Sequence, residues 1–200
     1  IFSYQLSLEI LRNNLDKLTS NTYNFDSKDA INHIRKILPF NLTGEQLVCS
    51  KEIIQDLSTA KRTLRLLQGD VGSGKTVVAA ISAYYVLKSG YQVVILAPTE
   101  LLAKQHYNFF IKTFYNQKLE ISLLLSSSVD KKDIKKKIYS GEINLIIGTH
   151  ALFQKDVKFR KLSYVIIDEQ HRFGVEQRFN LIKKGKKVDM LLLTATPIPR

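Results

Sequence analysis

Apolar residues along this chain of 200 residues follow two patterns. Short, nearly continuous apolar runs are separated by segments in which apolar residues recur every three or four positions. Continuous runs of four to eight residues are typical of strands buried on both faces, and the longer spacing is typical of helices. The sequence therefore predicts an α/β fold with a mostly parallel sheet and helices on both faces.

Six apolar runs are predicted strands, and these are 64–67, 92–97, 121–125, 143–147, 164–167 and 190–193. The intervening segments predict helices that run through 77–81, 100–114 and 130–139. Ligands of such sheets bind beyond the carboxyl ends of the strands. The polar residues that follow each run are therefore the candidate functional residues.

Residues 1–38 are predicted to form a helical segment that precedes the main domain and serves structural packing rather than function. Leucines at three- and four-residue spacing predict a helix in the first twenty residues, and isoleucines predict a second over 27–38. A further helix is expected from 44 to 57. Because the chain opens on Ile1 and residues 194–200 end it soon after an apolar run, with no closing helix or polar tail, we expect both ends to be cut.

One stretch combines glycines with a lysine and a hydroxyl after the first predicted strand, and it consists of Gly69, Asp70, Val71, Gly72, Ser73, Gly74, Lys75 and Thr76. Glycine permits backbone angles that turn successive N–H groups toward one phosphate, and a helix N-terminus adds partial positive charge. Lys75 can reach the β- and γ-phosphates, and Thr76 can bind Mg²⁺. The stretch predicts a nucleoside triphosphate site; a glycine-rich turn with a chance lysine is the alternative.

The acidic pair Asp168–Glu169 follows the predicted strand 164–167. Asp168 can hold Mg²⁺, commonly through water, and Glu169 can orient and activate an attacking water. An acidic pair at the end of a strand is otherwise only a solvated turn. Because a phosphate-binding loop stands upstream, we interpret the pair as the second half of an ATPase site.

Gln46 has two interpretations. Thr43 and Gln46 have the spacing of a capping box, in which each side chain satisfies a free backbone N–H. An amide can also donate and accept at once, as recognition of an adenine edge requires. The residues alone leave both open.

The composition of the chain adds little to the functional interpretation. The 30 Lys and Arg against 18 Asp and Glu give a net charge of +12, which suits a nucleic-acid partner but also follows from a bias toward Lys, Ile and Asn. The lysine-rich stretches 131–137 and 183–187 are more simply solvated surface than phosphate contacts. Cys49 is the only cysteine, so a disulfide framework is excluded and a reducing cytoplasm fits. No apolar run approaches the length of a membrane span.

Five ordered motifs resemble those of superfamily 2 helicases, and they cover 69–76, 97–103, 148–152, 168–175 and 194–200. The runs Asp-Glu-Gln-His-Arg-Phe-Gly-Val and Thr-Ala-Thr-Pro-Ile-Pro-Arg are specific to the bacterial RecG family of branched-DNA helicases. Gln170 stands where the related transcription-repair coupling translocases usually carry Glu. The resemblance implies a RecA-like P-loop NTPase domain over 39–200, with 1–38 as a helical linker.

The resemblance also implies roles for the matching residues. Gln46 would read adenine, and His171 would join Lys75, Asp168 and Glu169 as a catalytic residue that links the nucleotide site to a partner lobe. Coupling of hydrolysis to DNA movement would fall to Thr194 and Thr196. The DNA-backbone track would consist of Pro98, Thr99, Glu100, Gly148, Thr149 and His150.

The implied function is ATP- and Mg²⁺-dependent remodelling of branched or forked DNA, including fork regression and Holliday junction branch migration in recombination and repair. Superfamily 2 helicases close their ATP site with a second RecA-like lobe that carries arginine fingers. This chain stops before such a lobe, which could come in cis or from a separate chain, so we expect it to be inactive alone. The alternative is a nonenzymatic remnant of a split or decaying helicase gene that binds nucleotide or DNA weakly. A transporter ATPase lacks support because the chain has no Leu-Ser-Gly-Gly signature.

Overall fold

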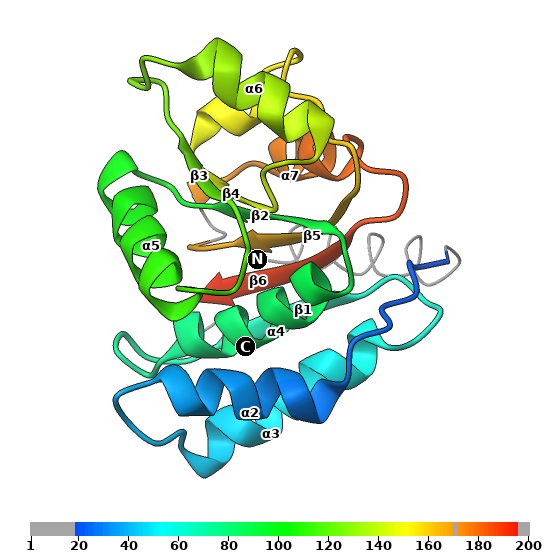
Figure 1. Ribbon diagram of the computed structural model, residues 1–200, viewed down its shortest axis with the longest axis vertical. Helices are drawn as coiled ribbons and strands as arrows, with labels where there is room; N and C mark the ends of the chain where they lie inside the picture. The colour runs from blue at the N-terminus through cyan, green and yellow to red at the C-terminus, as the bar shows by residue number, and fades with distance from the viewer. Residues whose placement is uncertain (1–18, 170–171, 196–200) are drawn as a thin grey trace.

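The computed structural model describes residues 19–169 and 172–195 (Figure 1). Within these residues, six strands form one parallel sheet in the order β1–β6–β5–β2–β4–β3. The strands are β1 (Leu64–Gln68), β2 (Gln92–Leu96), β3 (Ile121–Leu124), β4 (Leu145–Gly148), β5 (Leu162–Ile167) and β6 (Asp189–Thr194). The predicted mostly parallel sheet is confirmed.

Helices cover both faces of the sheet. They are α2 (Ser27–Ile37), α3 (Gly44–Leu57), α4 (Lys75–Lys88), α5 (Glu100–Thr113), α6 (Lys131–Ser140), the 3₁₀ helix η1 (His150–Phe153) and α7 (Val175–Ile182). On one face α4 packs on the sheet, and α2 and α3 lie against the outside of α4 (Figure 1). On the other face lie α6, η1 and α7.

The alternation of side chains along each strand explains why both faces are apolar. In β2, Val93 and Ile95 belong to the core beneath α4, whereas Val94 and Leu96 belong to the core beneath α6 and α7. All four side chains are at most 1% exposed. Successive side chains of a strand point to opposite faces, so a strand buried on both sides must be apolar throughout.

The strand register brings the candidate functional residues to one edge of the sheet. Gln68 at the end of β1 pairs with Thr194 at the end of β6. Ile167 at the end of β5 pairs with Leu192 of β6 on one side and with Leu96 of β2 on the other. Each of these strands ends at the same edge, so the loops that follow them are neighbours.

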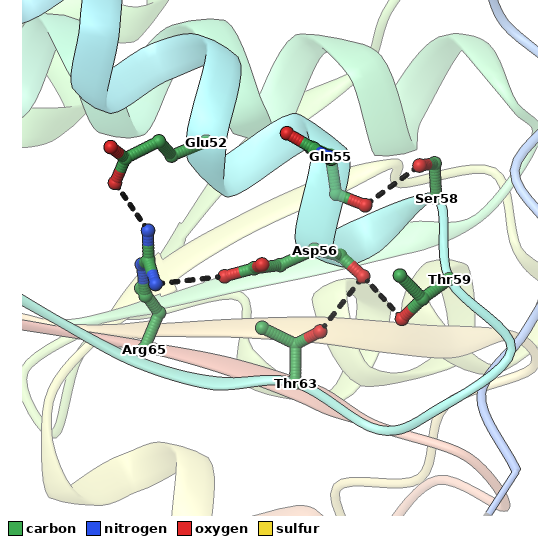
Figure 2. Close-up of polar contacts among 7 residues, drawn as sticks. All are labelled: Glu52, Gln55, Asp56, Ser58, Thr59, Thr63 and Arg65. Atoms are coloured by element: carbon green, nitrogen blue, oxygen red, sulfur yellow. Dashed lines mark hydrogen bonds and ion pairs between the residues drawn. The ribbon is translucent and has the colours of Figure 1, made fainter.

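A set of polar contacts fixes the entry into β1 (Figure 2). The carbonyl oxygen of Asp56, in the last turn of α3, accepts hydrogen bonds from the hydroxyls of Thr59 at 2.7 Å and Thr63 at 3.1 Å. Arg65 of β1 pairs with Glu52 at 2.5 Å and with the Asp56 carboxylate at 3.3 Å. Carbonyls of a last helical turn lack intrahelical partners, and here side chains supply them. The direction of β1, and of the loop after it, is thereby tied to α3.

The segment before α2 is anchored at the opposite end of the sheet from the candidate site. Asp189, which begins β6 and is 0% exposed, accepts hydrogen bonds from Ser20 at 2.6 Å, from Tyr23 at 2.6 Å and from the backbone N–H of Thr63 at 2.7 Å. Burial raises the pKa of Asp189, and these three hydrogen bonds oppose that shift. The buried side of α2, including Ile34, lies in the same core as α4.

Several sequence expectations differ from the structure. Strand β4 begins at Leu145 rather than at residue 143, and neither η1 nor α7 was expected. The helix expected in the first twenty residues lies almost entirely outside the described residues, and the division between 1–38 and 39–200 stays a prediction. Among the helices of residues 19–169 and 172–195, none is long and apolar enough to cross a membrane.

The lysine-rich stretches make local contacts. Lys135 pairs with Asp156 at 2.6 Å and donates to Gln154, and Lys137 pairs with Asp133 at 3.1 Å. Lys184 donates to the carbonyl oxygens of Gln154 at 2.6 Å and Val157 at 2.8 Å. These contacts favour the interpretation of the stretches as protein surface over their interpretation as phosphate contacts.

Candidate active site

The predicted phosphate-binding loop joins β1 to α4. Gly72 and Gly74 both adopt a φ of +83°, a conformation in which a side chain would be strained. The loop is closed by a hydrogen bond from the Ser73 N–H to the Asp70 carbonyl at 3.1 Å, and the Gly69 N–H donates to the Thr194 carbonyl at 3.2 Å. The start of the loop is therefore held by a backbone hydrogen bond to the neighbouring strand β6. The positive φ angles favour glycine where the loop turns.

Lys75 is the first residue of α4. Its ammonium group donates to the carbonyl oxygens of Gly69 at 2.6 Å and Asp70 at 2.7 Å, so the side chain folds back over the loop. Among the described residues, no side chain caps the N-terminus of α4. Free N–H groups at a helix start, the helix dipole and a lysine above the loop together provide the chemistry of a polyphosphate site.

Gln46 takes part in two contacts at once. Its side-chain oxygen accepts from the Thr43 N–H at 3.0 Å while the Thr43 hydroxyl accepts from the Gln46 N–H at 3.2 Å, which confirms the capping box. The remaining amide nitrogen donates to the Ser73 carbonyl at 2.9 Å. Gln46 thus caps α3 and contacts the phosphate-binding loop, and its contact with adenine stays a prediction.

Asp168 and Glu169 follow β5 directly. The Asp168 N–H continues the sheet by donating to the Leu96 carbonyl at 2.9 Å, and Glu169 then leaves the strand with a φ of +48°. Asp168 Oδ1 accepts the Glu169 N–H at 3.0 Å. The sharp turn after the strand holds the Asp168 carboxylate at the edge of the sheet, with the side chain 14% exposed.

His106 is a functional candidate that the sequence analysis missed. It lies on α5, is 8% exposed, and its Nε2 is 2.8 Å from Asp168 Oδ2. A histidine in the middle of an amphipathic helix, 62 positions before its partner, carries no spacing signal that could have identified it.

The donor set suits a magnesium ion that is bound mainly by phosphate. The described part of the chain contains no group of three or more His, Cys, Asp or Glu side chains placed to hold a metal. Magnesium is commonly bound by one or two protein oxygen ligands together with substrate phosphates and water. The half-buried Thr76 hydroxyl and the Asp168 carboxylate are the residues that would hold it.

The predicted DNA track falls on two neighbouring loops, after β2 and β4. Thr99 is exposed and caps α5 by accepting the Leu102 N–H at 3.2 Å, and the Glu100 carboxylate accepts from the Ser127 hydroxyl at 2.8 Å. Glu100 therefore organises the loop after β3. The contact of Glu100 with DNA stays a prediction, as does that of the half-buried Pro98.

The second half of the predicted track is mostly buried. Gly148 is buried, and an added Cβ there would lie 2.3 Å from the Leu124 carbonyl oxygen. Thr149 is 4% exposed, whereas His150 is exposed and its ring packs edge-on against Phe173, with centroids 5.7 Å apart. Phe173 is buried and follows the Asp168–Glu169 turn, so this contact joins the segment after β4 to the segment after β5.

The predicted coupling residues are only partly described. Thr194 ends β6, is 2% exposed and offers its carbonyl to the Gly69 N–H. His171 and Thr196 lie outside the described residues. Their predicted roles therefore stay predictions.

The sequence matches a known family. The DEAD/DEAH box helicase family model matches residues 45–200, and the chain belongs to that family. The fold, a six-stranded parallel sheet between helices with a phosphate-binding loop after β1, is RecA-like as predicted.

Within this family the chain is similar to proteins named ATP-dependent DNA helicase RecG. It is 45% identical over 199 residues to that of Bacillus subtilis, with 98% of this chain and 29% of the relative covered. It is 48% identical over 176 residues to that of Borreliella burgdorferi, with 87% of this chain and 26% of the relative covered. The chain thus spans less than a third of the length of these relatives.

The chain is also similar to solved helicase structures. A structure of RecG bound to a three-way DNA junction has a TM-score of 0.84 and 42% identity, covering 99% of this chain and 27% of that one. The DEAD-box helicase Mss116 bound to ssRNA and UDP-BeF has a TM-score of 0.66 at 23% identity, covering 89% of this chain and 40% of that one, and supports the fold alone.

Proposed function

We propose that this chain is the ATP-binding motor lobe of a RecG-type DNA helicase that remodels branched or forked DNA in recombination and repair. One observation carries the proposal. A single strand, β6, separates β1, which leads into the phosphate-binding loop, from β5, which Asp168 follows directly. This arrangement gives the loop and the acidic pair a common edge of the sheet, as an ATPase site requires.

Each residue of the site then has a chemical role. The N–H groups of the loop and the Lys75 ammonium bind the phosphates of ATP, and Thr76 and Asp168 hold the magnesium ion, which neutralises charge on those phosphates. Glu169 orients the attacking water and accepts its proton. Gln46, already beside the loop, recognises the adenine edge.

DNA is bound at the loops that follow β2 and β4. The exposed Thr99 and His150 can contact phosphate oxygens without reading bases, and a net charge of +12 favours the encounter with a polyanion. The RecG structure similar to this chain is bound to a three-way junction, which supports branched DNA as the partner. We expect the protein to act on DNA in the cytoplasm.

Turnover requires a second RecA-like lobe, in cis or from another chain. His171, Thr194 and Thr196 connect the ATP site to that lobe and to DNA movement. Arginine fingers, which such a lobe supplies, raise turnover by about 10³- to 10⁵-fold in related phosphoryl transfer. The 200-residue chain alone therefore binds ATP but is inactive as an ATPase.

ATP turnover by the purified chain tests the proposal. The rate is measured with and without forked DNA, with and without a separately produced second lobe of the Bacillus subtilis relative, and beside a Lys75→Ala variant. We expect no turnover by the chain alone and DNA-dependent turnover with the second lobe, which Lys75→Ala abolishes. No increase with either addition would favour the alternative, a nonenzymatic remnant of a helicase gene.

A further inference from the structure

The Asp168 carboxylate is held at both of its oxygens. Oδ1 accepts the Glu169 N–H at 3.0 Å, and Oδ2 lies 2.8 Å from His106 Nε2. Because a carboxylate can only accept, the imidazole donates from Nε2. The backbone bond fixes one side of the carboxylate, and the imidazole fixes the other.

The contact between His106 and Asp168 is sheltered, and it crosses between elements. The His106 side chain is 10% exposed and that of Asp168 is 14% exposed, so water competes little for the bond. His106 is carried by α5, and Asp168 follows β5, a different part of the chain. The Asp168 rotamer therefore depends on where α5 lies and not only on its own strand.

We propose that His106 is a positioning residue for magnesium binding, which orients the Asp168 carboxylate through the Nε2–Oδ2 hydrogen bond. This inference rests on the proposed ATP site. Hydrogen bonds to a metal-binding carboxylate fix its direction, and removing such outer contacts typically weakens metal binding or activity by about 10- to 100-fold. His106 itself touches neither nucleotide nor metal in this role.

Helix α5 connects the His106–Asp168 contact with the predicted DNA track. The helix begins at the predicted DNA track, where Thr99 caps it and Glu100 bonds to the loop after β3. One rigid element thus extends from the predicted DNA contacts to the Asp168 carboxylate.

Two amide substitutions separate the positioning role from simple packing. In His106→Gln the side-chain nitrogen reaches about as far from the backbone as Nε2 and can still donate to Asp168. In His106→Asn the nitrogen stands closer to the backbone and cannot reach. Both variants keep a polar, planar group on α5, and their unfolding free energies are compared first to establish that both fold.

The experiment measures ATP binding by calorimetry with magnesium and with EDTA. The ratio of the two dissociation constants is the gain in affinity that magnesium provides, and Asp168→Asn supplies the reference for its loss. We expect His106→Asn to lower this gain about tenfold without changing the affinity in EDTA, and His106→Gln to retain most of it. A general structural defect would instead weaken binding under both conditions equally.

The outcomes separate this inference from the proposed function. If the wild-type chain binds no ATP, or binds it without any gain in affinity from magnesium, the proposed ATP site and the proposed role of His106 are both wrong. If the wild-type chain shows the gain and His106→Asn retains it in full, only the role of His106 is overturned. Equal losses in the Asn and Gln variants would likewise overturn it, because the hydrogen bond would not be the cause.

Discussion

The side-chain amide of Gln46 donates to the Ser73 carbonyl across 2.9 Å and so joins the first turn of α3 to the phosphate-binding loop. The same side chain accepts the Thr43 N–H at 3.0 Å. One residue therefore caps α3 and contacts the loop, while recognition of adenine, the alternative to capping in the sequence analysis, stays a prediction. A change at Gln46 should affect both stability and nucleotide binding.

Gln46→Ala should weaken ATP binding about tenfold and lower the unfolding free energy by about 1 kcal/mol. The first effect follows from losing the amide that contacts the loop and that we propose to bind adenine, and the second from losing half of the capping box. Calorimetry and urea unfolding measure the two effects. Gln55→Ala is the matched control, since Gln55 lies on the same helix with an exposed side chain. Wild-type affinity in Gln46→Ala would contradict the predicted role.

Two glycines of the loop, which share the same positive φ, provide a comparison. Both Gly72 and Gly74 have a φ of +83°, but only at Gly74 would a new Cβ meet Gln46 Nε2, at 2.3 Å. Either alanine substitution should cost about 1–2 kcal/mol in unfolding free energy from backbone strain. Gly74→Ala should cost about 1 kcal/mol more, because Gln46 must abandon its hydrogen bond to Ser73.

The Gln46→Ala background tests that explanation. With the glutamine side chain gone, Gly72→Ala and Gly74→Ala should have the same cost in urea unfolding. An excess for Gly74→Ala that persists in this background would mean that Gln46 is not the group in the way.

Asp189 should make the stability of the chain depend on pH. Burial raises its pKa in the fold above the value of about 4 in the unfolded chain, so the fold favours the protonated carboxyl. Its stabilising contribution is complete below about pH 4 and is lost as the pH rises through the folded pKa. The unfolding free energy of wild type minus that of Asp189→Asn should therefore fall as the pH rises from 4. A difference that grows with pH would contradict this assignment.

The sequence predicted the sheet because apolar runs such as 92–97 must be buried on both faces. It predicted the phosphate-binding loop and the Asp168–Glu169 pair because local spacing carries their chemistry. The contacts of His106 with Asp168 and of His150 with Phe173 depend on which strands are neighbours, and periodicity does not encode strand order. Helix α7 was missed because it has only 8 residues, between Gly174 and the lysines after Ile182, and a helical repeat is recognised over a window of about 11 to 18 residues.

Equilibrium binding of ATP with magnesium to the 200-residue chain tests the central claim most directly. Wild type should bind, and Lys75→Ala should lose about 100-fold in affinity, because a charge-assisted contact to phosphate is worth up to about 3 kcal/mol. Lys88→Ala, at the other end of α4, is the control and should bind as wild type does. Absence of binding by the wild-type chain, or equal binding by Lys75→Ala, would contradict the assignment of this loop as the ATP site.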